Sequence, residues 1–157
     1  MPSYHDVVKH VGSDVPFFIN KKPATISGIG ENVVNLNDIS PMKIIIAVPK
    51  IGLNTKQVFE KYDSIKSKHS EKFLWNGISI FNDLWNSSIE IYPELKTIKQ
   101  NLEDSYNKNF FMSGSGSALF SLFEEHEEIE EIVSKELSLK YFSITKKIDC
   151  SLSQNDD

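Results

Sequence analysis

The chain has 157 residues, a formal net charge of −5 at pH 7, 39% hydrophobic residues and 25% charged residues. This length corresponds to one average domain or two small ones, and the hydrophobic content argues against an intrinsically disordered chain. All of the basic residues are lysine, and acidic residues outnumber them. This balance argues against a nucleic-acid-binding protein, which needs a basic surface.

Membrane and secreted proteins are also disfavoured. The longest apolar runs, such as residues 44–48, are far too short to span a bilayer, and the N-terminus lacks the pattern of a secretory signal. The single cysteine, Cys150, excludes an intrachain disulfide and suits a reducing compartment. We therefore expect a cytoplasmic protein that does not bind membranes.

The first part of the chain contains short predicted elements. Valines at helical spacing predict that residues 4–11 form the last turns of a helix. The short apolar segment 15–19 suggests a buried extended segment. Residues 24–36 alternate like strands, with two glycines that suggest a turn or a bulge. The polar connector 37–41 is the predicted domain boundary.

The hydrophobic pattern changes after this connector. The β-branched run 43–48 predicts a central strand buried on both faces. Asn54 followed by Gln57 predicts a helix start. We expect residues 77–91 to be helical in part, and a helix after Pro93 with one apolar face formed by Leu95, Ile98 and Leu102.

The remaining elements complete the predicted order. Residues 109–112 form a short strand, 113–116 a turn, 117–123 a strand, 124–137 an acidic helix and 141–148 a final strand, followed by a disordered tail over 151–157. This order of strands and helices is typical of a split βαβ, ferredoxin-like sandwich. We therefore predict an α+β fold with an antiparallel sheet and helices on one face.

Three polar segments could carry chemistry. Asp14 follows a glycine turn and precedes apolar residues, which suits a general base held by rigid neighbours; the alternative is an ordinary turn aspartate. Residues 113–117 (SGSGS) could form an anion-binding nest or a tight hairpin. Residues 81–84 (FNDL) could cap a helix or bind a neighbouring loop. Residues 27–31 (SGIGE) resemble a fragment of a phosphate-binding loop, but they lack a following helix and a lysine, so the glycines more simply allow a turn.

Other catalytic patterns are missing from the sequence. The four histidines lack metal-ligand spacing with Cys150 or with carboxylates, so we predict no metal site made by this chain. No serine sits in a nucleophile elbow. The acidic run 124–128 is most simply a solvated helix face.

Taken together and in order, five segments resemble the C-terminal part of 4-diphosphocytidyl-2-C-methyl-D-erythritol kinases, a family of the GHMP kinase superfamily. The segments are residues 12–18 (GSDVPFF), 28–31 (GIGE), 81–84 (FNDL), 92–95 (YPEL) and 112–117 (MSGSGS). The resemblance implies a transferase of the non-mevalonate pathway of isoprenoid (terpenoid) biosynthesis. It would use ATP and Mg²⁺ to phosphorylate the 2-hydroxyl of the methylerythritol moiety of its small-molecule substrate.

The resemblance also implies roles for single residues. Asp14 matches the catalytic aspartate that orients or deprotonates the acceptor hydroxyl. Thr55 and Phe59 match positions that line the cytidine diphosphate pocket, with Phe59 stacking on the cytosine; without the resemblance, Phe59 reads as a helix core residue. Ser113, Gly114, Ser115, Gly116 and Ser117 match the third motif, a loop that supports the phosphate region. Trp85 departs from the glutamate common in the family.

The family's catalytic lysine strand and glycine-rich ATP loop have no counterpart in these 157 residues. Because phosphoryl transfer depends on cationic stabilisation of the phosphates, we expect no kinase activity from this chain alone. A separate N-terminal half would be its partner. The alternative is a non-catalytic ferredoxin-like binding module derived from the kinase.

The resemblance further predicts the domain organisation. Residues 1–38 would be the remnant of the N-terminal GHMP kinase domain that carries Asp14, and residues 42–150 the ferredoxin-like C-terminal domain. The apolar strands of the first segment would lack sheet partners and leave exposed edges.

Overall fold

The computed structural model describes residues 15–20, 22–30, 32–36, 39–65, 72–130 and 139–145. The chain divides into two compact units between Pro41 and Met42, and each unit is described here by itself. The predicted helix over residues 4–11 and the predicted tail over 151–157 lie outside the described residues. Within the described ranges, no helix combines the length and the hydropathy needed to cross a membrane.

The first unit contains a short helix and a β-hairpin. Helix α2 (Val15–Asn20) precedes strands β1 (Ala24–Ser27) and β2 (Asn32–Asn35), which pair antiparallel. The turn glycines have positive φ angles, which side-chain-bearing residues rarely adopt. The hairpin agrees with the predicted strands and turn. The extended segment expected over 15–19 is wrong, because a proline near the start of a segment favours the first turn of a helix.

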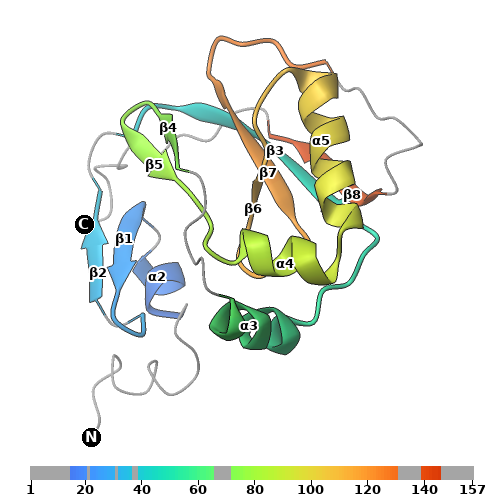
Figure 1. Cartoon of the computed structure of the whole chain (residues 1–157). Helices are drawn as coiled ribbons and strands as arrows, with labels where there is room; N and C mark the ends of the chain where they lie inside the picture. Colours follow the sequence, from blue (N-terminus) through green and yellow to red (C-terminus); the bar gives the residue numbers. More distant parts are fainter. Residues whose placement is uncertain are drawn as a thin grey trace, which may run out of the picture. The chain divides into compact units, whose positions relative to one another are not determined.

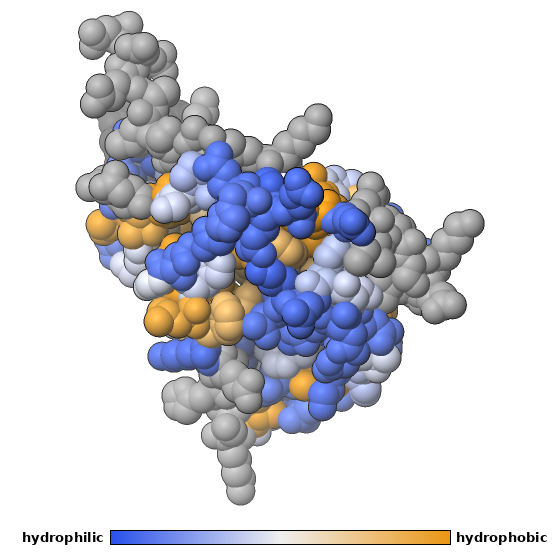
Figure 2. Space-filling model, turned by 90° about the horizontal axis from the view of Figure 1, so that it is seen from above, coloured by the Kyte–Doolittle hydropathy of each residue, from blue (hydrophilic) through white to orange (hydrophobic). Residues whose placement is uncertain are grey.

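The first unit exposes several large apolar side chains. Ile29 is 79% exposed, Phe18 70% and Val34 64%. Figure 2 shows one face of the molecule, on which hydrophilic residues cover more of the coloured surface and hydrophobic residues form separate patches. A two-stranded hairpin with this many exposed apolar side chains buries too little surface for independent stability.

The second unit is built on a four-stranded antiparallel sheet (Figure 1). The strand order is β6 (Phe111–Met112), β7 (Leu119–Glu124), β3 (Met42–Pro49) and β8 (Leu139–Ile144). Among the four strands of this sheet, β3 comes first along the chain and lies between the third, β7, and the last, β8. This is the order of a split βαβ sandwich. This arrangement confirms the predicted α+β fold class.

In the described part of this unit, three helices accompany the sheet: α3 (Thr55–Ser64), α4 (Trp85–Ile91) and α5 (Glu94–Tyr106). The predicted start of α3 is confirmed, since the Asn54 side chain accepts a hydrogen bond from the Gln57 amide. In Figure 1, α5 lies in front of the sheet, and its buried residues share one core with residues of β3 and β7. The predicted apolar face of α5 is buried and packs in one core with strand residues; this core contains Ile45, Ala47, Leu95, Ile98, Leu102, Phe110, Met112, Leu119 and Phe123.

The expectation that β3 is buried on both faces is wrong. Ile45 and Ala47 are fully buried on the face packed in this core, whereas Ile46 on the opposite face is 36% exposed. The described helix residues in the core, all from α5, lie against the first face alone. The continuous apolar run therefore does not mark a strand covered on both sides.

A second hairpin was not predicted. Strands β4 (Phe73–Trp75) and β5 (Ile78–Ile80) pair antiparallel around Asn76 and Gly77, whose φ angles are +45° and +80°. Two successive positive φ angles in an Asn-Gly loop are the pattern of a type I′ turn. Of the range 77–91, only Trp85–Ile91 is helical.

The acidic helix expected from Glu124 is wrong over residues 124–130. Glu124 is the last residue of β7 and pairs with Met42, and the chain then turns without helix up to Glu130. The Glu127 carboxylate accepts a hydrogen bond from the Glu124 amide, which closes this turn. Residues 131–137 of the predicted helix lie outside the described residues.

Candidate active site

The serine- and glycine-rich loop 113–117 joins β6 to β7. The Ser113 amide donates to the Ala118 carbonyl at 2.9 Å, and the Gly116 amide donates to the Ser113 carbonyl at 3.0 Å. These two amides are used within the loop itself. This arrangement supports the tight hairpin over an anion-binding nest built on these donors.

Asn82 braces this loop from outside. Its Nδ2 donates to the carbonyls of Met112 at 2.7 Å and Gly114 at 2.8 Å, while its Oδ1 accepts from the Leu84 amide at 3.0 Å. The Asn82 side chain thus connects the segment that leads into α4 to the end of β6 and to the loop. Of the two alternatives that the sequence left open for residues 81–84, binding a neighbouring loop is the one that these bonds support.

The tip of the loop contacts the start of α3. The Thr55 and Ser115 hydroxyl groups lie 2.9 Å apart, and either can be the donor. The Ser88 hydroxyl of α4 donates to the Ser115 carbonyl at 3.4 Å. Two segments 60 residues apart in sequence, both singled out in the sequence analysis, are therefore in direct contact.

Tyr92 positions the start of α3 from the end of α4. Its hydroxyl accepts from the Asn54 amide at 3.3 Å and donates to Gln57 Oε1 at the same distance. Residues 92–95 belong to the segments that carry the resemblance, which implied no role for Tyr92. The lone tyrosine gives no local signal for this contact, because its partner lies 35 to 38 residues away.

Phe59 lies one turn after Thr55 on α3 and is 50% exposed. The buried residue of this helix is Val58 instead. The alternative that Phe59 is a core residue is therefore wrong. An exposed ring one turn from a hydroxyl that contacts the loop is free to stack on a planar group.

Asp14 lies outside the described residues, and its relation to Thr55, Phe59 and the loop stays a prediction. Trp85, the departure from the resemblance, packs at the edge of the core, and the Lys99 ammonium lies 5.6 Å from its ring centroid.

The described residues do not fit an ATP–Mg²⁺ site. Within them, no three His, Cys, Asp or Glu side chains gather where they could hold a metal ion. The loop 113–117 uses two of its amides internally. We therefore derive no step of phosphoryl transfer through ATP or Mg²⁺ from these residues.

Comparisons with known proteins agree with the resemblance that the sequence motifs indicate. The family model "GHMP kinases C terminal" matches residues 70–136. The 4-diphosphocytidyl-2-C-methyl-D-erythritol kinase of Protochlamydia amoebophila is 36% identical over 114 residues, which is 71% of this chain and 40% of that protein. The kinase of the same name from Anaplasma phagocytophilum is 33% identical over 164 residues, 96% of this chain and 55% of that protein.

A solved structure shares the fold. The crystal structure of a 4-(cytidine 5′-diphospho)-2C-methyl-D-erythritol kinase matches with a TM-score of 0.65 and 24% identity, over 78% of this chain and 48% of that one. The chain spans about half the length of the curated relatives it matches. Over residues 70–136, this chain therefore shares the C-terminal domain of the GHMP kinases.

Proposed function

We propose that this chain carries the acceptor side of a kinase that phosphorylates the 2-hydroxyl of 4-diphosphocytidyl-2-C-methyl-D-erythritol in non-mevalonate isoprenoid biosynthesis. The observation that carries the proposal is the contact between Thr55 of α3 and Ser115 of the braced loop, next to the exposed ring of Phe59. The relatives of this name, at 30–36% identity, support the same substrate.

Each site residue has a distinct part in this proposal. Phe59 stacks on the cytosine, and Thr55 lies at the edge of the same pocket. The loop of Ser113, Gly114, Ser115, Gly116 and Ser117 is held by Asn82 and supports the substrate's phosphates. Asp14 orients the acceptor hydroxyl or takes its proton, which a positioned carboxylate can do.

The proposal includes a division of labour between two domains. Residues 1–38 belong to the N-terminal kinase domain and residues 42–150 form the C-terminal one. The ATP-binding loop and catalytic lysine come from residues outside this sequence, in the same polypeptide or a separate one. The exposed Ile29, Val34 and Phe18 support this, since they would be covered by the rest of the N-terminal domain. We propose the cytoplasm as the site of action.

An activity assay tests the proposed function. The 157-residue chain is incubated with ATP, Mg²⁺ and 4-diphosphocytidyl-2-C-methyl-D-erythritol, alone and together with the N-terminal half of the Anaplasma phagocytophilum relative. We expect no product from the chain alone and substrate-dependent product from the mixture. Asp14→Asn should abolish the product, while Asp104→Asn, on the exposed side of α5, should not.

The results of this assay distinguish the proposed kinase function from a non-catalytic binding module. Product from the chain alone that Asp14→Asn abolishes would contradict the need for a second part. No product from the mixture, combined with binding of cytidine diphosphate that depends on Phe59, would favour the non-catalytic binding module. Neither product nor binding would overturn the proposed substrate.

A further inference from the structure

A cavity of about 550 Å³ lies in the second unit, with Asn82 in its lining. It is formed by the start of β4, the segment before α4, one face each of α4 and α5, and the strand entry at 109–112. Its volume is in the range of small-molecule sites. The residues lining it are Lys72, Phe73, Phe81, Asn82, Trp85, Asn86, Ile89, Lys96, Lys99, Asn109, Phe110, Phe111 and Met112.

The charge of this lining is opposite to that of the protein. The chain has a net charge of −5, yet among the described residues the charged side chains that line the cavity are all lysines, Lys72, Lys96 and Lys99. Among the described residues, neither Lys72 nor Lys96 has a carboxylate within ion-pair distance. A low-dielectric wall with ammonium groups of one sign concentrates the potential that attracts an anion.

Two of the lysines are held against aromatic walls. The Lys72 ammonium lies 5.2 Å from the Phe81 ring centroid, and the Lys99 ammonium lies 5.6 Å from that of Trp85. Both distances are within the range of cation–π attraction. The cavity therefore presents flat apolar rings and positive charge at its wall.

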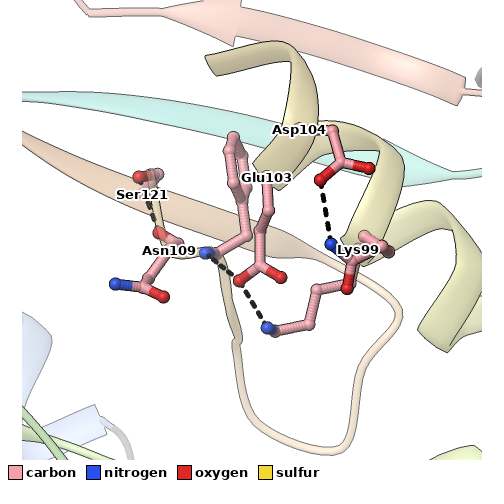
Figure 3. Close-up of polar contacts among 7 residues, drawn as sticks. Lys99, Glu103, Asp104, Asn109 and Ser121 are labelled. Carbon is pink, nitrogen blue, oxygen red and sulfur yellow. Dashed lines mark hydrogen bonds and ion pairs between the residues drawn. The ribbon is translucent and has the colours of Figure 1, made fainter. Parts of the chain in front are cut away.

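A small polar network fixes the part of the cavity wall that contains Lys99 and residues 109–110 (Figure 3). Glu103 accepts from Lys99 and, at 3.0 Å, from the Phe110 amide, while the Ser121 hydroxyl donates to the Asn109 carbonyl at 2.8 Å. Phe110 is fully buried. Because Glu103 already compensates Lys99, the positive charge that no carboxylate of the described residues pairs comes from Lys72 and Lys96.

We propose that this cavity is a second binding site, which takes a small organic anion with a flat ring, such as an aromatic phosphate or carboxylate. The ring would lie between Trp85, Phe81 and Phe111, and the acidic group would face Lys72 and Lys96. The site is separate from the proposed cytidine pocket, because neither Thr55 nor Phe59 lines it.

The test uses 1-naphthyl phosphate as probe and the full 157-residue chain. Calorimetric titration measures the affinity, and the indole N–H signals in NMR spectra report the location. We expect saturable binding that shifts the Trp85 signal and leaves that of Trp75 unchanged in its position. Neutral 1-naphthol and inorganic phosphate should each bind at least about tenfold more weakly, since each lacks one of the two features.

Matched variants locate the charge. Lys72→Gln combined with Lys96→Gln should weaken binding by about tenfold or more, because hydrogen bonds between charged groups are the stronger ones. Lys140→Gln, an exposed lysine of β8 outside the lining, should leave the affinity unchanged. Saturable binding absent up to millimolar probe, equal binding of 1-naphthol, or an unaffected double variant would each overturn the proposal.

Discussion

Of the two glycines in the loop, Gly116 has the less room for a side chain. Its φ angle is +94°, and a Cβ at this position would lie 2.6 Å from Leu53 Cδ2 and 2.9 Å from Met112 Sδ. Both distances are shorter than carbon and sulfur atoms tolerate. Gly114 also has a positive φ, +56°, but has open space around it. The two glycines of one motif thus serve different physical needs.

Gly116→Ala should lower the free energy of unfolding by about 2–3 kcal/mol, because it adds overpacking to backbone strain. Gly114→Ala should cost about 1 kcal/mol through the backbone alone. Gly52→Ala, with open space and no positive φ, should change stability by less than about 0.5 kcal/mol. Urea unfolding of the three variants checks this order, and equal losses at Gly116 and Gly114 would contradict it.

Glu127 gives a pH-dependent contribution to stability. Burial raises the pKa of its carboxyl, but hydrogen bonds from Lys108 and the Glu124 amide, with the charges of Lys108 and His126, lower the pKa below its ordinary value of 4.5. A carboxyl whose pKa is lower in the folded state stabilises the fold above its unfolded pKa. This stabilisation is lost as the pH falls through the folded pKa.

The difference in unfolding free energy between the wild type and Glu127→Gln should therefore be largest near neutral pH. It should shrink steadily from pH 4.5 downward as the carboxylate is protonated. Urea unfolding at pH 7, 5, 4 and 3 measures this difference, in which the other titrating groups largely cancel. A difference that stays constant or grows in acid would show that the ionised form does not stabilise the turn.

At the scale of elements, Asn82 connects three parts of the site. It links the segment before α4 to the end of β6 and to the loop that contacts α3. The local pattern of polar residues with apolar neighbours offered loop binding by residues 81–84 as one of two alternatives. It could not predict which loop, because the partner carbonyls lie 30 and 32 residues away.

Asn82→Asp should lower the unfolding free energy by about 2–3 kcal/mol. Aspartate has no donor for the Met112 and Gly114 carbonyls and places negative charge beside them. Asn101→Asp, the same exchange at an exposed position of α5, should cost far less. Hydrogen exchange at the amides of Ser113 and Gly116 should also accelerate in Asn82→Asp only. Similar unfolding curves for the two variants would argue against the brace.

The predicted elements fared differently for physical reasons. The helix after Pro93 was predictable because its apolar residues repeat at helical spacing and are buried as a face. The acidic helix from Glu124 was misplaced, because strand pairing with Met42 and the Glu127 turn override helix propensity there. The Asn76-Gly77 turn carried a clear local signal that the sequence interpretation did not use.

At the scale of the whole molecule, the order of motifs predicted the family resemblance, which the comparisons support, and the order of strands and helices predicted the fold class, which the sheet order confirms. The contact between Thr55 and Ser115 was not predicted, because the two residues lie 60 positions apart and no local pattern links them. The lysine-lined cavity was missed altogether, since its lining spans 41 residues of sequence from Lys72 to Met112 without any periodic spacing. Long-range packing of this kind leaves no mark in a single sequence.

The central claim is that this chain carries the acceptor side of the kinase, with its cytidine pocket, and titration with cytidine 5′-diphosphate tests this claim most directly. We expect the full chain to bind this ligand. Phe59→Ala should weaken binding by about 5- to 150-fold, the equivalent of about 1–3 kcal/mol of base stacking. Tyr141→Ala, an aromatic residue of similar exposure on β8, should have no effect. No binding, or equal binding by the wild type and Phe59→Ala, would contradict the account.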